Sequence, residues 1–211
     1  MLIQPHKVND ILAAHNIQVT GVLHIGAHEC EELNFYTSSL QVKPEDVVWI
    51  DGLFAKVSEA VNRGIPNVYC AVMSDTDGQD VTFNVANNGQ SSSILEFKTH
   101  SIEHPHVVFV DKFTSKTTRV DTFLKTNNLD GSKYNFWNLD IQGAELLVLK
   151  GAVENLKYAK VIYTEVNENH LYEDCALIGE IDTFLATFGF KRVFTEMTQH
   201  GWGDAIYILS E

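Results

Sequence analysis

Four apolar runs in the sequence end in or beside an acidic residue. The acids are Asp51, Asp75, Asp140 and Glu165, and each follows residues that favour a buried strand. In an open parallel sheet, ligands bind at the carboxyl ends of the strands, so these carboxylates would meet at one edge. A single aspartate in such a place is more often a helix N-cap. Carboxylates at four of five predicted strand ends indicate instead a clustered ligand site.

The turn after the first apolar run indicates which ligand the site would hold. It reads "GAHECEE", from Gly26 to Glu32. A nicotinamide dinucleotide requires a G-x-G-x-x-G turn that cradles the pyrophosphate. Here His28 and Glu31 occupy the second and third glycine positions, and Glu29, Glu31 and Glu32 would repel phosphate. S-adenosylmethionine has no phosphate and carries a sulfonium and an ammonium, so the acidic turn favours it.

Two of the acids have specific partners on that cofactor. Asp51 lies 25 residues after Gly26, near the spacing of about 20 residues at which an acid binds ribose hydroxyls in dinucleotide folds. We therefore expect the Asp51 carboxylate to accept both ribose hydroxyls. Asp75, at the third predicted strand end, is expected to accept from the adenine amino group.

The elements that position these residues alternate along the chain. A short helix over about residues 5–16 comes first, and near-continuous apolar strands then alternate with helices. The predicted strands are "VTGVLHIGAH", "EDVVWIDG", "NVYCAVMSD", "YNFWNLDI" and "AKVIYTEV". The predicted helices are "EELNFYTSSL", "FAKVSEAVNRG", "AELLVLKGA" and "LIGEIDTFLATFG". This alternation predicts an α/β three-layer sandwich with a mostly parallel sheet. A closing hairpin, "FKRVFTEM" and "DAIYILS", would add an antiparallel strand.

One long excursion, residues 78–121, interrupts the alternation. Two further strands, "DVTFNVA" and "HVVFVDKF", flank the polar loop "NNGQSSS" within it. An elaborate loop of this kind above the strand ends predicts a region that covers the substrate.

Several segments resemble the FkbM-type S-adenosylmethionine-dependent methyltransferases. "LDIQGAELLVLKGA" is similar to the family motif D-x-E-G-x-E with its following apolar stretch, and "VLHIGAHECEE" to the first motif. "AVMSDTDGQDVTF" and "GQSSSIL" resemble the third-strand segment and the serine-containing loop. Three residues depart from the pattern: His24 replaces a usual Asp, Cys30 a second glycine, and Gln142 the commoner Glu. The pair Asp51–Gly52 stands where the family has E-P.

The resemblance spans about residues 22–209 and implies a single methyltransferase domain over residues 1–211. It also implies the Rossmann-like class I methyltransferase sheet of seven strands, with the last strand antiparallel. The cofactor would be S-adenosylmethionine, released as S-adenosylhomocysteine, and the acceptor a hydroxyl, often on a sugar. Together with the strand ends, it places the cofactor against His24, Gly26, Ala27, Asp51, Gly52, Ser74, Asp75 and Asp140.

Methyl transfer to oxygen is an in-line displacement, so the enzyme mainly aligns the oxygen with the carbon–sulfur bond. A neutral hydroxyl also needs a base, a role worth about 10²–10⁴-fold in rate. The candidates are Asp140, Glu165 and His170. A histidine such as His170 is more often a surface loop residue without a catalytic role.

Composition limits the partners. The net charge is −13 over 211 residues with scattered Lys and Arg, which disfavours nucleic acid and anionic membranes. No apolar stretch is long enough to span a membrane, and the start lacks a signal-peptide pattern. Cys30, Cys70 and Cys175 show no disulfide or metal spacing, which favours a reducing cytoplasm.

The histidines do not predict a metal site. His24 and His28 straddle a strand–turn junction, and His100, His104 and His106 lie in a polar loop without recognised ligand spacing. We therefore expect no metal. Two alternative functions stay open at this point: an NAD-dependent sugar-modifying oxidoreductase, and a non-catalytic methyltransferase-like binding module. The acceptor and the oligomeric state are not predicted.

Overall fold

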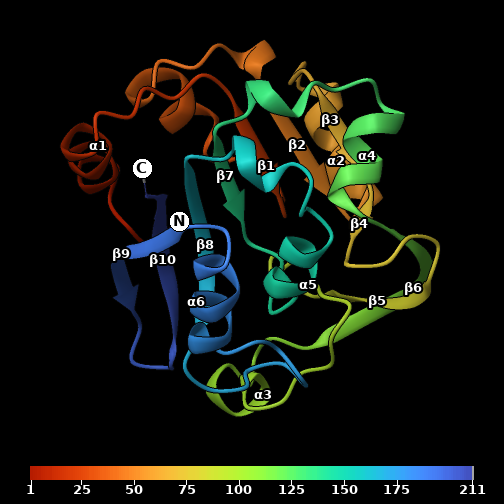
Figure 1. Cartoon of the computed structure of the whole chain (residues 1–211). Helices are drawn as coiled ribbons and strands as arrows, with labels where there is room; N and C mark the ends of the chain where they lie inside the picture. Colours follow the sequence, from red (N-terminus) through yellow and green to blue (C-terminus); the bar gives the residue numbers. More distant parts are fainter. Residues whose placement is uncertain (211) are drawn as a thin grey trace.

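The computed structural model describes residues 1–210 and is built on a seven-stranded sheet (Figure 1). In spatial order the strands are β3 (Val68–Cys70), β2 (Val47–Asp51), β1 (Val22–Ile25), β7 (Phe136–Leu139), β8 (Val161–Asn167), β10 (Trp202–Leu209) and β9 (Phe190–Met197). The first five pair in parallel, and β10 is antiparallel to both of its neighbours. The predicted mostly parallel sheet with a reversed last strand is therefore confirmed.

Helices cover both faces of this sheet and complete three layers. One face packs against α1 (Pro5–Ala14), a π-helix (Phe35–Ser39) and α2 (Phe54–Asn62). The other face packs against α4 (Val120–Thr126), α5 (Glu145–Lys150) and α6 (Ile178–Ala186). Adjacent residues of one strand serve opposite cores: Val22 packs in the first and Leu23 in the second. Burial on both faces explains why the strands read as continuous apolar runs.

A smaller sheet lies beside the central one. Its order is β4 (Val72–Met73), β6 (Phe109–Thr118), β5 (Asp80–Ala86), and α3 (His100–Glu103) lies in the β5–β6 connection. This region, predicted as a cover, is joined to the loop after β8. The Lys98 N–H donates to the Leu171 carbonyl at 2.8 Å, and Phe97 forms an isolated bridge with Tyr172. The cover and that loop therefore form one wall.

The third strand differs from the prediction. β3 ends at Cys70, and after Ala71 the chain leaves the central sheet to form β4, which pairs with β6. Ser74 and Asp75 consequently follow a strand of the smaller sheet. β8, by contrast, continues past Glu165 to Asn167.

The helices show three further differences. α1 ends at Ala14, the segment after the first turn contains a π-helix, and α4 was not predicted. Short 3₁₀ turns span Pro44–Asp46, Gly131–Lys133 and Leu156–Tyr158. Within residues 1–210, no helix is both long and apolar enough to cross a membrane.

Candidate active site

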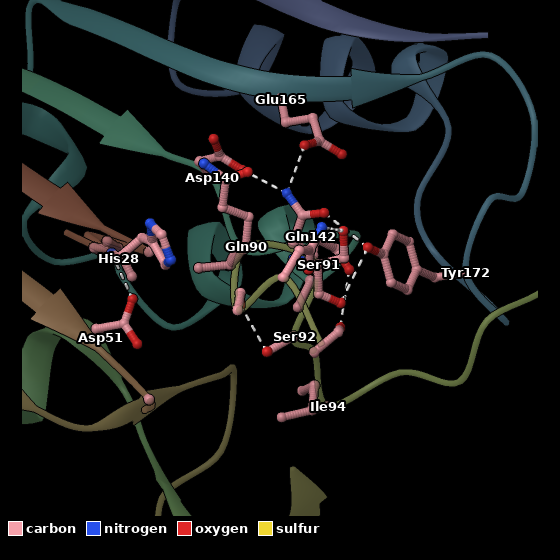
Figure 2. Close-up of a pocket in the computed structure, with 18 of the residues that line it drawn as sticks. His28, Asp51, Gln90, Ser91, Ser92, Ile94, Asp140, Gln142, Glu165 and Tyr172 are labelled. Carbon is pink, nitrogen blue, oxygen red and sulfur yellow. Dashed lines mark hydrogen bonds between the residues drawn. The ribbon is translucent and has the colours of Figure 1, made fainter. Parts of the chain in front are cut away.

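A cavity of about 530 Å³ opens where β1, β2 and β7 end. This volume lies within the range of about 300–1,000 Å³ that is usual for ligand sites. Asp51 and His28 lie at one end of it, Tyr172 at the other, and Asp140 with Gln142 between them (Figure 2). The loop of residues 88–94 from the cover closes a further side.

Asp51, at the end of β2, binds the backbone on either side of it. Its Oδ2 accepts the N–H of His28 and its Oδ1 that of Leu53, both at 2.7 Å. Burial raises the pKa of the Asp51 carboxyl, and the two backbone hydrogen bonds act against that rise. Each carboxylate oxygen has a second lone pair. Two acceptors therefore remain for the vicinal hydroxyls of a ribose.

The backbone N–H groups of the turn after β1 are already used within the protein. Gly26 and Ala27 both donate to the Ile50 carbonyl, at 2.8 and 3.0 Å, and His28 donates to Asp51. A pyrophosphate site needs such groups to point at the ligand. The turn therefore does not fit a dinucleotide, whereas a phosphate-free, cationic cofactor fits its acidic side chains.

Gly26 allows the ends of two strands to approach closely. Its φ is +88°, and a Cβ there would lie 1.8 Å from the Asp140 carbonyl oxygen. The Asp140 N–H in turn donates to the Ile25 carbonyl at 3.0 Å. Only glycine permits this contact, which brings Asp140 beside the turn after β1.

Asp140 and Glu165 are bridged by the side-chain amide of Gln142 (Figure 2). Gln142 Nε2 lies 2.7 Å from Asp140 Oδ1 and 2.8 Å from Glu165 Oε2, and the Tyr172 hydroxyl donates to Gln142 Oε1 at 2.7 Å. Burial, followed by the negative charge of Asp140, raises the pKa of Glu165 well above its usual range. The protonated form of Glu165 is therefore favoured more than in an exposed glutamate.

Glu145 has a structural position. It is 1% exposed, and its Oε1 accepts the N–H groups of Ile141 and Gly143 at 3.0 and 3.1 Å. Burial raises the pKa of this carboxyl to about 7. Glu145 therefore fixes the loop that carries Gln142 and does not line the cavity.

His24 is an uncharged part of the cavity wall. Burial lowers the pKa of this histidine to about 4. The Tyr36 hydroxyl lies 3.1 Å from His24 Nδ1 and accepts a hydrogen bond from Asn138 at 2.7 Å. The aspartate that is usual here in the family is thus replaced by a neutral ring.

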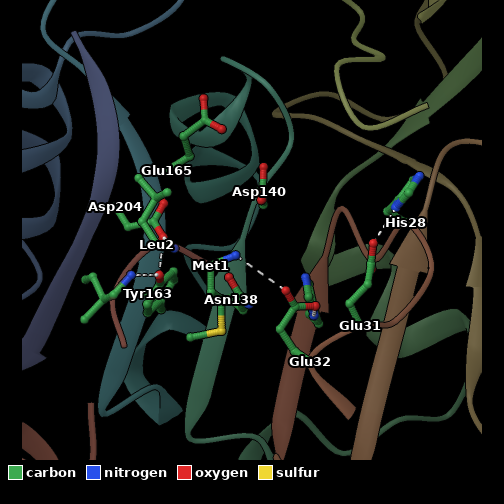
Figure 3. A network of polar contacts seen from close by, with 12 residues as sticks. Met1, Leu2, His28, Glu31, Glu32, Asn138, Asp140, Tyr163, Glu165 and Asp204 are labelled. Atoms are coloured by element: carbon green, nitrogen blue, oxygen red, sulfur yellow. Dashed lines mark hydrogen bonds and ion pairs between the residues drawn. The ribbon is translucent and has the colours of Figure 1, made fainter. Parts of the chain in front are cut away.

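The chain start and β10 supply a further part of the wall. Asp204 accepts hydrogen bonds from the Tyr163 hydroxyl and from the Leu2 N–H (Figure 3). The Met1 amine lies 3.6 Å from Glu32 Oε1. Glu32 and Asp204 thus add two carboxyl groups to the cavity wall that also contains Asp140.

Six of the residues predicted from the sequence line the cavity: His24, Gly26, Asp51, Gly52, Asp140 and Glu165. The structure does not bring the other four to it. Ser74 and Asp75 have left the main sheet, and Ala71, Val72 and Met73 line the cavity in their place. His170 Nδ1 instead lies 2.9 Å from the Cys175 carbonyl, and Ala27 is buried in the core.

Sequence reasoning missed several residues of the wall. Gln142 had been noted only as a departure from a motif, and no local signal connects it with Tyr172, 30 positions away. Met73, Phe83 and Asp204 also line the cavity. Their positions depend on pairing between distant segments.

Comparison with known proteins identifies the family of the chain. Residues 24–192 match the methyltransferase FkbM domain. The chain belongs to the FkbM methyltransferase family. Membership of a methyltransferase family does not fit the alternative prediction of an NAD-dependent oxidoreductase.

One curated relative matches part of this FkbM methyltransferase. Over 98 residues it is 35% identical to the 2-O-methyltransferase NoeI of Sinorhizobium fredii (strain NBRC 101917 / NGR234), a segment covering 46% of this chain and 40% of that protein. The chain thus spans less than half of the length of that relative.

Solved structures of methyltransferases resemble this chain only weakly, both in sequence and in backbone superposition. The methyltransferase domain of bacterial CtHen1-CN is 10% identical with a TM-score of 0.47, covering 97% of each chain. A SAM-dependent methyltransferase from Aquifex aeolicus is 11% identical with a TM-score of 0.46, covering 99% of this chain and 100% of that one. The assignment rests on the family match.

Proposed function

We propose that this FkbM methyltransferase transfers a methyl group from S-adenosylmethionine to a hydroxyl oxygen of a sugar. The observation that carries the proposal is the pair Asp140 and Glu165, bridged by Gln142 between the Asp51 end and the Tyr172 end of the cavity. Transfer to oxygen is supported by the relative, which is named a 2-O-methyltransferase.

Asp51 is assigned to the ribose hydroxyls, because it retains two acceptors at the end of β2. The carboxylates of Asp140 and Glu32 provide negative charge for the methionine ammonium. When bound, S-adenosylmethionine supplies a methyl group made electrophilic by its sulfonium. Ala71 and Met73 offer an apolar surface for the adenine at the site where Asp75 was expected.

Asp140 is assigned as the general base. The hydroxyl loses its proton as its oxygen forms the bond to carbon, and a carboxylate must take that proton. Glu165 is the second candidate, since burial and neighbouring carboxylates raise its pKa and so favour its protonated form. Gln142 holds one oxygen of Asp140 at 2.7 Å and leaves the other for the acceptor. Glu165 stays the alternative base, and His170 lies outside the cavity.

A sugar suits the groups that the cover contributes. The cover lines the cavity with the polar side chains of Gln90, Ser91 and Ser92. Trp202, at the start of β10, adds a flat apolar surface. Hydroxyls of a sugar need many hydrogen-bond partners, while its C–H faces pack on aromatic rings. The three free cysteines support the proposed location in a reducing cytoplasm.

The test is incorporation of label from methyl-labelled S-adenosylmethionine into a panel of sugars, with phenols and hydroxy acids as other hydroxyl acceptors. Methylation of a sugar hydroxyl, located by NMR, is the expected result. Methylation confined to the non-sugar acceptors would refute the sugar assignment. Binding of S-adenosylhomocysteine without turnover on any acceptor would favour the non-catalytic module.

A further inference from the structure

The cavity wall is strongly acidic. Within residues 1–210 it includes no lysine or arginine side chain and contains six carboxyl groups, those of Glu31, Glu32, Asp51, Asp140, Glu165 and Asp204. The Met1 amine in the wall is paired with Glu32. Lys56, on α2, is paired with Glu29 at 2.5 Å and with Glu59 at 3.2 Å. No lysine or arginine is therefore placed to neutralise phosphate groups in the cavity, and the His28 ring in the wall is paired with Glu31 at 2.7 Å.

The histidines of the cover do not supply that charge. His100 is 5% exposed and lines the cavity, and burial lowers its pKa to about 4. Burial also lowers the pKa of His104, which lines the same wall. Both rings are therefore neutral near pH 7, and a neutral imidazole offers one donor and one acceptor to uncharged hydroxyls.

His100 has unused hydrogen-bonding capacity. Its Nδ1 is buried without a hydrogen-bond partner in the described part of the chain. The ring stacks on Phe97, with ring centroids 4.2 Å apart, and packs against Tyr172, with ring centroids 5.3 Å apart. These two contacts hold it in place. A buried polar atom without a partner is costly, so a turn of the ring that brings Nδ1 to a ligand hydroxyl in the cavity would be favoured.

We infer that the cover side of the cavity, lined by His100, His104, Tyr172 and Trp202, is a subsite for an uncharged saccharide. This inference rests on the proposed function and narrows it. The acceptor would be a sugar without phosphate or carboxylate, and so one no longer attached to a nucleoside diphosphate. A glycosyl transfer or a hydrolysis that releases the sugar from its nucleotide carrier must therefore precede methylation.

The decisive experiment compares each sugar in two forms, as its methyl glycoside and as its nucleoside diphosphate conjugate, at saturating S-adenosylmethionine. We expect kcat/KM for the glycoside to be at least tenfold higher, because phosphates would face an acidic wall that offers no lysine or arginine. Equal or faster methylation of the nucleotide form would overturn the inference and leave the sugar function standing. Absence of transfer to both forms would instead refute the proposed sugar function itself.

Variants of the subsite provide a second measurement. His100→Ala is expected to raise KM for the glycoside at least tenfold without changing S-adenosylhomocysteine affinity. His100→Gln keeps a donor and an acceptor and covers the case in which the alanine variant does not fold. Ile102→Ala is the matched control, since Ile102 lies in the same short helix but is 74% exposed. An unchanged KM in both folded His100 variants would remove His100 from the subsite.

Discussion

Gln142 Nε2 donates a hydrogen bond to Glu165 Oε2 at 2.8 Å, and the same nitrogen is 2.7 Å from Asp140. One amide thus contacts both the carboxyl of raised pKa and the proposed base. Gln142 is held in turn from the cover side, where Tyr172 donates to its side-chain oxygen and Ser93 to its backbone carbonyl. Its φ of +57° is rare for a residue other than glycine, so these contacts hold it in a strained conformation.

This arrangement predicts different outcomes for the two carboxyl groups. Asp140→Asn removes the base and is expected to lower kcat by about 10²–10⁴-fold. Glu165→Gln replaces an acid whose protonated form is favoured with a neutral amide of the same shape, so kcat should fall by less than about tenfold. Steady-state rates of methyl transfer to a sugar acceptor measure both. The opposite ranking would make Glu165 the base.

The raised pKa of Glu165 predicts a pH-dependent stability. The unfolded chain releases this proton near the ordinary value of 4.5, whereas the folded protein keeps it to a much higher pH. The folded state then binds more protons, so this group lowers the free energy of unfolding as pH rises through that window. Glu165→Gln is neutral throughout. In urea unfolding, the stability of the variant relative to wild type should therefore increase from about pH 4 to about pH 8. A constant difference between the two proteins at every pH would contradict the assignment.

The ribose assignment of Asp51 is tested with a matched pair of aspartates. Asp51→Ala should weaken S-adenosylhomocysteine binding by about 10–100-fold, since hydrogen bonds to a charged group contribute roughly 1.5–3 kcal/mol. Asp75→Ala is the control, because Asp75 lies outside the cavity. Titration calorimetry of both variants with S-adenosylhomocysteine measures the two affinities. Undiminished affinity in Asp51→Ala would exclude the ribose role, and a loss in Asp75→Ala would restore the adenine contact expected from the sequence.

Two glycines allow the cost of backbone strain to be measured separately from the cost of a steric clash. Gly26 and Gly64 have φ values of +88° and +80°, but an added Cβ meets the Asp140 carbonyl at 1.8 Å at Gly26 and nothing within 4 Å at Gly64. Gly64→Ala should cost about 1–2 kcal/mol of unfolding free energy, from conformation alone. Gly26→Ala should cost clearly more and also weaken cofactor binding. Equal costs in denaturant unfolding would mean that Asp140 is not held by this contact.

The sequence by itself determined the layers of the fold and the strand-end part of the site. Strands buried on both faces must be continuously apolar, and the residues that end them are adjacent in sequence to the turns that expose them. Gly26, Asp51 and Asp140 were therefore predictable from local pattern. The acidic turn also indicated a cofactor without phosphate, for a reason that depends on charge alone.

Tertiary structure decided the remainder of the site. Ser74 and Asp75 follow an apolar run that reads as one strand, but the chain passes between two sheets at Ala71 and carries them away. The proton on Glu165 depends on burial and on carboxylates from other strands. The contact of Gln142 with Tyr172 depends on how the loop after β8 packs. Such long-range proximity and desolvation have no local sequence signal, because they arise only when separate segments pack together.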